Sequence, residues 1–141
     1  MRSKIAVLFW LAALLPADAA TLSVTDAWFR ALPPSVPSGG YFTLRNDGAG
    51  PVTLTGAQSP ACGMLMLHKS ENMGGMSSMA DVANIDVAAG GALSFAPGGY
   101  HLMCMDAKPM LKPGGHVPVT LLFKDGANLT VSFAVRGAMG K

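Results

Sequence analysis

Short extended segments separated by turn residues predict a small all-β protein, either a sandwich or a barrel. Three observations support this fold class. No apolar repeat with a helical period of 3.6 follows residue 20, and nine short alternating or apolar runs occupy the rest of the chain. Each run is also bounded by Gly, Pro, Asn or Asp. Nine strands in about 115 residues is the strand density of a β-sandwich.

The expected strands follow from alternation and from the residues that bound each run. The last one is the clearest, because Leu129, Val131, Phe133 and Val135 alternate with smaller or polar side chains. In chain order the expected strands cover residues 21–30, 40–46, 52–58, 64–70, 80–87, 92–96, 100–105, 117–124 and 128–136.

The segments between these runs have the composition of turns. The stretches "NDGAG" (46–50), "AAGG" (88–91), "APGG" (96–99), "KPGG" (112–115) and "KDG" (124–126) supply glycine, which accepts positive φ, and proline, which fixes its own φ. The methionine-rich stretch "ENMGGMSSM" (71–79) is expected to be one longer loop. A single domain over residues 20–141, with no internal repeat, follows.

The first nineteen residues are predicted to be a secretory signal peptide. Arg2 and Lys4 precede the apolar run "IAVLFWLAALL" (5–15), and an Ala-Asp-Ala cleavage pattern ends at Ala19. Eleven apolar residues are too few to span a bilayer, so we expect export to the periplasm without stable membrane insertion. In that oxidising compartment Cys62 and Cys104 can form a disulfide.

The charge of the expected mature chain argues against nucleic acid as a partner. Without Arg2, Lys4 and Asp18, eight Lys or Arg face seven Asp or Glu, and no basic run stands out. We also find no nucleophile with a base and no carboxylate pair in a persuasive context, so we do not expect an enzyme.

Methionine and histidine gather in one part of the chain. Eight of the nine methionines after residue 20 lie between residues 64 and 110, together with His68 and His101. Methionine alone more often fills gaps in a core. In a strand, however, residues two apart point to the same face, so His101 projects with Met103, and His68 projects with Met64 and Met66. If the two strands are neighbours, their histidines converge.

Such a set of donors favours Cu(I). Thioether sulfur attracts Ca²⁺, Mg²⁺ or Mn²⁺ only weakly, whereas soft Cu(I) accepts thioether and imidazole together. Zinc sites are built mainly from Cys, His and carboxylate.

The spacing of these residues resembles a family motif. His68, Met79, His101 and Met103 form the pattern H-X10-M-X21-H-X-M, which resembles the motif of periplasmic copper chaperones of the PCuAC type. Similar segments elsewhere are "AWFRA" (27–31), "GGYFTLRN" (39–46), "SPAC" (59–62), "VAAGG" (87–91), "APGGYHLM" (96–103) and "VPVTLLF" (117–123).

The resemblance implies a cupredoxin-like, Greek-key β-sandwich that binds one Cu(I) per chain through His68, Met79, His101 and Met103. It also implies a role in copper homeostasis and in cytochrome c oxidase assembly. The partner would be a copper-receiving protein, such as the cytochrome c oxidase subunit with the binuclear copper centre, or another copper carrier. We expect a monomer. The chain stops at "RGAMGK", whereas many relatives end in a His- and Met-rich tail that can hold a second copper.

Several alternatives stay open at this stage. Cys104 should face away from Met103, and a disulfide to Cys62 competes with two free thiols because the parity of Cys62 does not obviously suit it. His116 matches no motif position and is expected in an exposed turn. An electron-transfer cupredoxin would need a Cys thiolate as ligand. A secreted β-sandwich interaction module would use the Met and His side chains only for packing.

Overall fold

The computed structural model describes residues 21–73 and 76–141, which form ten β-strands. Within these residues no helix has the length and apolarity needed to cross a bilayer. The predicted signal peptide lies outside the described residues. In chain order the strands are β1 (Leu22–Arg30), β2 (Ser38–Asn46), β3 (Val52–Gln58), β4 (Cys62–Met73), β5 (Met76–Asp81), β6 (Ile85–Val87), β7 (Ala92–Phe95), β8 (Tyr100–Ala107), β9 (His116–Phe123) and β10 (Asn128–Arg136).

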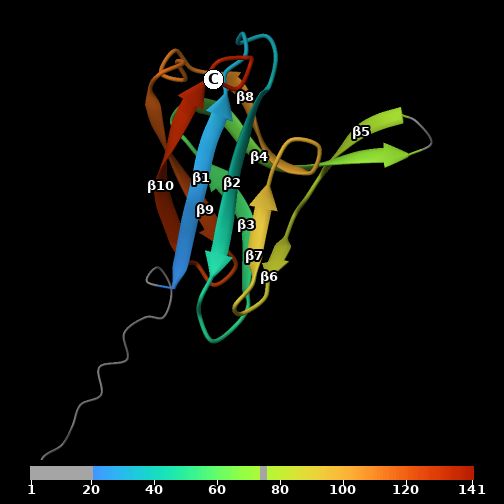
Figure 1. The fold of residues 1–141 in the computed structure, drawn as a ribbon, viewed down its shortest axis with the longest axis vertical. Helices are drawn as coiled ribbons and strands as arrows, with labels where there is room; N and C mark the ends of the chain where they lie inside the picture. Colours follow the sequence, from blue (N-terminus) through green and yellow to red (C-terminus); the bar gives the residue numbers. More distant parts are fainter. Residues whose placement is uncertain (1–20, 74–75) are drawn as a thin grey trace, which may run out of the picture.

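The strands hydrogen-bond in the order β5-β4-β8-β2-β1-β10-β9-β3-β6, and β7 pairs with β2. β1 and β10 run parallel, whereas the other pairs are antiparallel. Figure 1 shows β1, β2 and β7 in front, with β9 and β3 behind them. The path therefore folds over itself into two layers, and the non-sequential neighbours give the crossovers of a Greek-key sandwich. The predicted all-β class is confirmed, and the two packed layers agree with the predicted sandwich.

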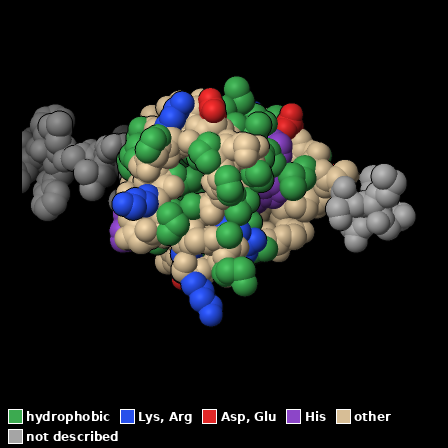
Figure 2. Space-filling view, turned by 90° about the horizontal axis from the view of Figure 1, so that it is seen from above, with side chains coloured by type: hydrophobic (Ala, Val, Ile, Leu, Met, Phe, Trp, Pro, Cys, Tyr) green, Lys and Arg blue, Asp and Glu red, His purple; other side chains and the backbone are tan. Residues whose placement is uncertain are grey.

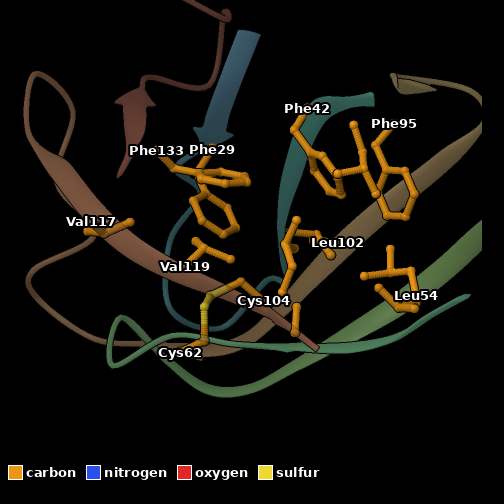
Figure 3. Packing of buried hydrophobic residues seen from close by; sticks show 14 of the residues in the cluster. Phe29, Phe42, Leu54, Cys62, Phe95, Leu102, Cys104, Val117, Val119 and Phe133 are labelled. Carbon is orange, nitrogen blue, oxygen red and sulfur yellow. A yellow bond between two sulfur atoms is a disulfide. The ribbon is translucent and has the colours of Figure 1, made fainter. Parts of the chain in front are cut away.

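The core lies between the two layers and is built from the residues of each strand that face inward (Figure 3). Phe133 packs against Phe29 and Phe42, with ring centroids 5.3 and 5.8 Å apart. Phe42 also meets Phe95 at 4.4 Å. The predicted alternation of β10 is confirmed, since Phe133 and Val135 are buried and Leu129 packs against the core. Aromatic pairs at these distances stabilise a core beyond the area they bury.

One predicted strand and one predicted loop were wrong. Residues 80–87 were expected to form one strand, but they divide between β5 and β6, which lie at opposite ends of the strand order. Ala83 and Asn84 lie between them, and asparagine disfavours a continuous strand. Within the expected loop over 71–79, residues 71–73 are the end of β4 and residues 76–79 belong to β5, with Met73 paired to Met76, whereas residues 74 and 75 lie outside the described residues. Figure 1 shows this hairpin extending away from the sandwich.

Candidate metal centre

The candidate site lies on one face of the neighbouring strands β4 and β8. Their antiparallel register pairs Met64 with Met105, Met66 with Met103 and His68 with His101. The residues between them turn to the opposite face, where Leu67, Leu102 and Cys104 are buried in the core. Alternation in the two paired strands therefore places the three pairs Met64 and Met105, Met66 and Met103, and His68 and His101 on the same side.

The two histidines form a directly opposed pair. The ring centroids of His68 and His101 are 5.7 Å apart at an interplanar angle of 68°, and each residue is only 7% exposed. His101 Nδ1 lies 3.2 Å from the carbonyl oxygen of Gly99. An Nδ1–H that donates to this carbonyl leaves a lone pair on Nε2. His101 Nε2 is buried and has no hydrogen-bond partner.

His68 has a carboxylate beside it that the sequence reasoning missed. Its Nε2 lies 2.6 Å from Asp81 Oδ1, at ion-pair distance, and neither ring nitrogen of His68 has a hydrogen-bond partner. Asp81 pairs directly with His68 across β4 and β5. The signal that could have found it is parity: Asp81 lies two residues after Met79, on the same face, once β5 is recognised as a strand.

Met79 reaches the site from β5. It pairs with Ser70 of β4, two residues along the strand from the His68 and Asp81 pair, and it is 61% exposed. Met79, His101 and Met103 line one cavity of about 300 Å³. The structure therefore brings three of the four motif residues to a common cavity. The fourth, His68, does not line this cavity, but its ring contacts the ring of His101.

A glycine and an aromatic ring shape the wall of this cavity. Gly39 pairs with Met103, and a Cβ at Gly39 would lie 2.7 Å from the hydroxyl oxygen of Tyr41. Tyr41 and Arg30 both line the cavity, and the Arg30 guanidinium lies 5.9 Å from the centre of the Tyr41 ring. The absence of a side chain at Gly39 therefore leaves room for the Tyr41 ring and hydroxyl in the cavity wall.

Histidine, hydrophobic and acidic side chains meet in one region of the molecular surface (Figure 2). In the view from above, histidine colour appears beside hydrophobic and acidic side chains on the side where the β4–β5 hairpin leaves the body (Figure 2). The described residues hold no group of three or more His, Cys, Asp or Glu placed for a metal. The donors gathered here are two imidazoles and two thioethers, a soft set that suits Cu(I).

Cys62 and Cys104 form a disulfide, with 5.4 Å between their Cα atoms, so the described chain has no free cysteine. Cys62 pairs in register with Ala107, not Cys104, and shares its parity with Met64. The alternation is interrupted at the next rung, where Asp106 has a φ of 57° opposite Gly63. This irregularity answers the parity objection raised by the sequence.

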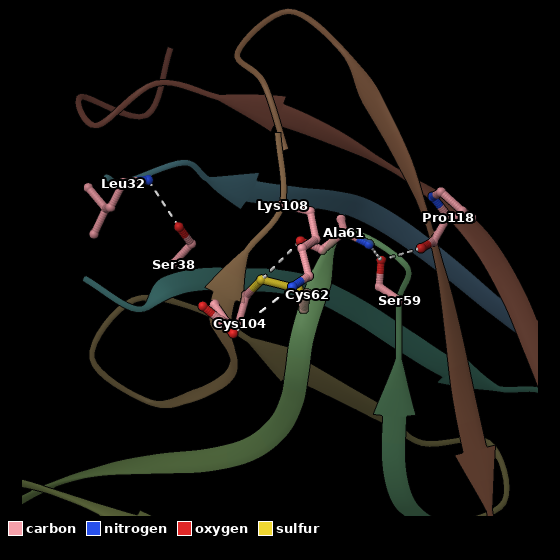
Figure 4. The surroundings of a disulfide bond; sticks show 9 residues. Leu32, Ser38, Ser59, Ala61, Cys62, Cys104, Lys108 and Pro118 are labelled. Atoms are coloured by element: carbon pink, nitrogen blue, oxygen red, sulfur yellow. Dashed lines mark hydrogen bonds and ion pairs between the residues drawn. A yellow bond between two sulfur atoms is a disulfide. The ribbon is translucent and has the colours of Figure 1, made fainter. Parts of the chain in front are cut away.

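The turn before β4 also helps to direct Cys62 inward (Figure 4). The Ala61 N–H donates to Ser59 Oγ at 3.2 Å, and the Lys108 N–H donates to the Ala61 carbonyl at 2.8 Å. Cys104 lies on the core face with its sulfur bonded, so it is not a thiolate donor for the cavity. His116, the third histidine, is exposed as predicted, but it is the first residue of β9 and not part of a turn.

Comparison with known proteins finds one family and one curated relative that are similar to most of this chain. The profile of the family described as "Putative lipoprotein LpqE-like" matches residues 22–135. A relative described as "Putative lipoprotein Lxx21020", from Leifsonia xyli subsp. xyli, is 32% identical and covers 89% of this chain and 80% of its own.

Solved structures share the fold. The Cu(I) form of DR1885 from Deinococcus radiodurans is 33% identical, with a TM-score of 0.64 over 89% of this chain and 81% of its own. The apo PCuAC domain of PmoF2 is 22% identical, with a TM-score of 0.67 over 84% of this chain and 91% of its own. At that identity the second match speaks for the fold alone.

Proposed function

The chain belongs to the LpqE-like family, with PCuAC domains among its structural neighbours, and we propose that it is an exported copper(I) chaperone. It carries one Cu(I) as cargo, bound by His68, Met79, His101 and Met103. It passes the ion to an acceptor outside the cytoplasm. DR1885, which was solved in its Cu(I) form, supports the identity of the metal.

One observation carries this proposal. His101 Nε2 is buried without a hydrogen-bond partner, in a residue that lines the same cavity as Met79 and Met103. A buried polar atom without a partner costs about 1–3 kcal/mol, and a bound metal ion removes that cost. The Gly99 carbonyl beside Nδ1 is the kind of neighbour that orients a metal-binding imidazole.

The donor set also suits transfer. Two neutral imidazoles and two neutral thioethers leave the bound ion with its single positive charge, so a receiving site rich in thiolates can displace them. Since Cys62 and Cys104 are joined, no thiolate of this chain competes for the ion. The disulfide also disfavours the electron-transfer cupredoxin alternative, which needs a cysteine ligand.

The acceptor we propose is the binuclear copper centre of cytochrome c oxidase or another extracytoplasmic copper carrier. We further propose that residues 1–19 direct the chain to the periplasm, where it acts as a monomeric carrier and not as an enzyme. The description of a 32% identical relative as a lipoprotein supports export. A disulfide in the core is also in keeping with an oxidising compartment.

The test is a competition titration with a chromophoric Cu(I) chelator. The native protein should hold one tight equivalent, and His101→Ala or Met103→Leu should weaken it at least about 10-fold. His116→Ala and Met139→Leu are matched controls, because both residues are exposed and lie outside the motif. Native affinity in His101→Ala with Met103→Leu combined would refute the ligand assignment.

X-ray absorption at the copper K-edge on the protein loaded with one equivalent provides a second test. We expect two nitrogen and two sulfur neighbours. An intense blue colour on adding Cu(II) would instead support an electron-transfer cupredoxin. Absence of any copper after purification with copper present, with no gain in thermal stability on adding Cu(I), would support a metal-free interaction module.

A further inference from the structure

We propose that Met64, Met66 and Met105 form a second, weaker site for Cu(I), which adjoins the four-residue site along the edge formed by Met103. The existence of this thioether site does not depend on the proposed function. Its role as a route by which copper enters or leaves the buried histidines does rest on that function.

The register of β4 and β8 places these side chains in successive cross-strand pairs on one face, and each such pair forms one rung. Met64 lies opposite Met105, and Met66 lies opposite Met103, on the face that carries His68 and His101. Directly opposed residues have Cβ atoms about 4.5–5.5 Å apart, and diagonal neighbours are about 7–8 Å apart. Methionine has three rotatable bonds beyond Cα, so sulfurs from two adjacent rungs can converge on one ion.

These methionines do not serve the core. Met64 is 57% exposed and Met105 is 37% exposed, and neither Met66 nor Met103 belongs to the residues packed against the core cluster. The core face of the same ribbon is filled by leucine and by the disulfide. Gap-filling, the usual role of a methionine, therefore does not account for this row.

Exposure falls steadily along the row. The first rung, Met64 with Met105, is exposed, the second, Met66 with Met103, is partly buried, and each histidine of the third is only 7% exposed. Soft donors thus occupy successive positions on one face, from the exposed end of the two strands to the imidazoles. Met103 belongs to the second rung and also lines the cavity with His101, so one side chain joins the two sites.

The three thioether sulfurs determine which metal ion this second site would bind. They are neutral, polarizable and without exchangeable protons, so they suit Cu(I) and the similar soft ion Ag(I) but hold Zn²⁺ poorly. Without an imidazole, the site should be weaker than the site with two histidines. A weak site at the surface and a tight site beneath it is the order expected for passing an ion inward.

The experiment is a titration of the whole protein, labelled with ¹³C at the methionine methyl groups, with Ag(I) as the probe. The first equivalent should shift the methyl signals of Met79 and Met103. The second should shift those of Met64, Met66 and Met105. In Met64→Leu with Met105→Leu the second event should disappear, while the first keeps its affinity within about 2-fold, because leucine preserves size and removes only the sulfur.

Two matched variants distinguish binding at this row from binding by methionines elsewhere in the chain. Met110→Leu with Met139→Leu removes two exposed sulfurs outside the row and should leave both events unchanged. A second event that survives in the Met64 and Met105 variant, or that vanishes in Met73→Leu with Met76→Leu alone, would overturn the proposal. If the native protein shows the second event without the first, the proposed chaperone site fails and this site stands.

Discussion

The disulfide between Cys62 and Cys104 should be a major source of stability, and its contribution can be worked out from the chain. The two cysteines are 42 residues apart. Closing a loop of that length removes about 13 cal/mol/K from the unfolded chain in the chain-entropy description, which corresponds to about 4 kcal/mol at 25 °C. Cys62→Ala with Cys104→Ala should therefore lose a large part of the free energy of unfolding, which is about 5–15 kcal/mol for a typical domain.

Urea unfolding followed by circular dichroism measures this loss. With a slope of about 1.5 kcal/mol per molar, the midpoint should fall by about 2.5 M. Cys104→Ala alone already removes the crosslink, so it should cost nearly as much as the double substitution. The reasoning fails if the two single losses add, or if the double variant loses less than about 1 kcal/mol, since packing and not the crosslink would then set the stability.

Three further outcomes are expected. Asp81→Asn should weaken the tight Cu(I) equivalent about 10-fold in a chelator competition, because the Asp81 carboxylate lies against His68, and it should leave the urea midpoint unchanged since the Asp81 side chain is 83% exposed. An unchanged affinity would show that Asp81 has no part in holding the imidazole. Gly40→Ala should lower the free energy of unfolding by about 1–3 kcal/mol, because its Cβ would lie 2.6 Å from the Phe29 ring. Gly50→Ala, with open space around it, is the control and should be nearly neutral; equal effects at both glycines would contradict the packing argument. Finally, Cu(I) affinity should fall as the pH is lowered, by up to about two log units per pH unit, because both imidazoles must be unprotonated to bind. A flat profile of affinity against pH, measured by the same competition, would exclude histidine ligands.

The position of the candidate site was largely predictable because it depends on the alternation of side chains in β4 and β8 and on the pairing of these two strands. The strand alternation that puts His101 and Met103 on one face is local, and the pairing of β4 with β8 confirms that His68 is opposite His101. The ligand role of all four motif residues is still a prediction, since it needs a metal measurement. Asp81 escaped notice because residues 71–79 resembled a loop, so Met79 and Asp81 were not placed in one strand and their shared face was not seen.

The amino-acid sequence by itself determined the all-β class, eight of the nine expected strands and the soft character of the donors, because these follow from local alternation, turn residues and side-chain chemistry. Only the tertiary structure decided the partners of each strand. Strand pairing is non-local, and it separated β5 from β6 and brought the carboxylate of Asp81 to His68. It also joined Cys62 to Cys104 in the core, at the start of β4 and beside the left-handed Asp106 of β8, although regular alternation from Met64 would place Cys62 on the other face.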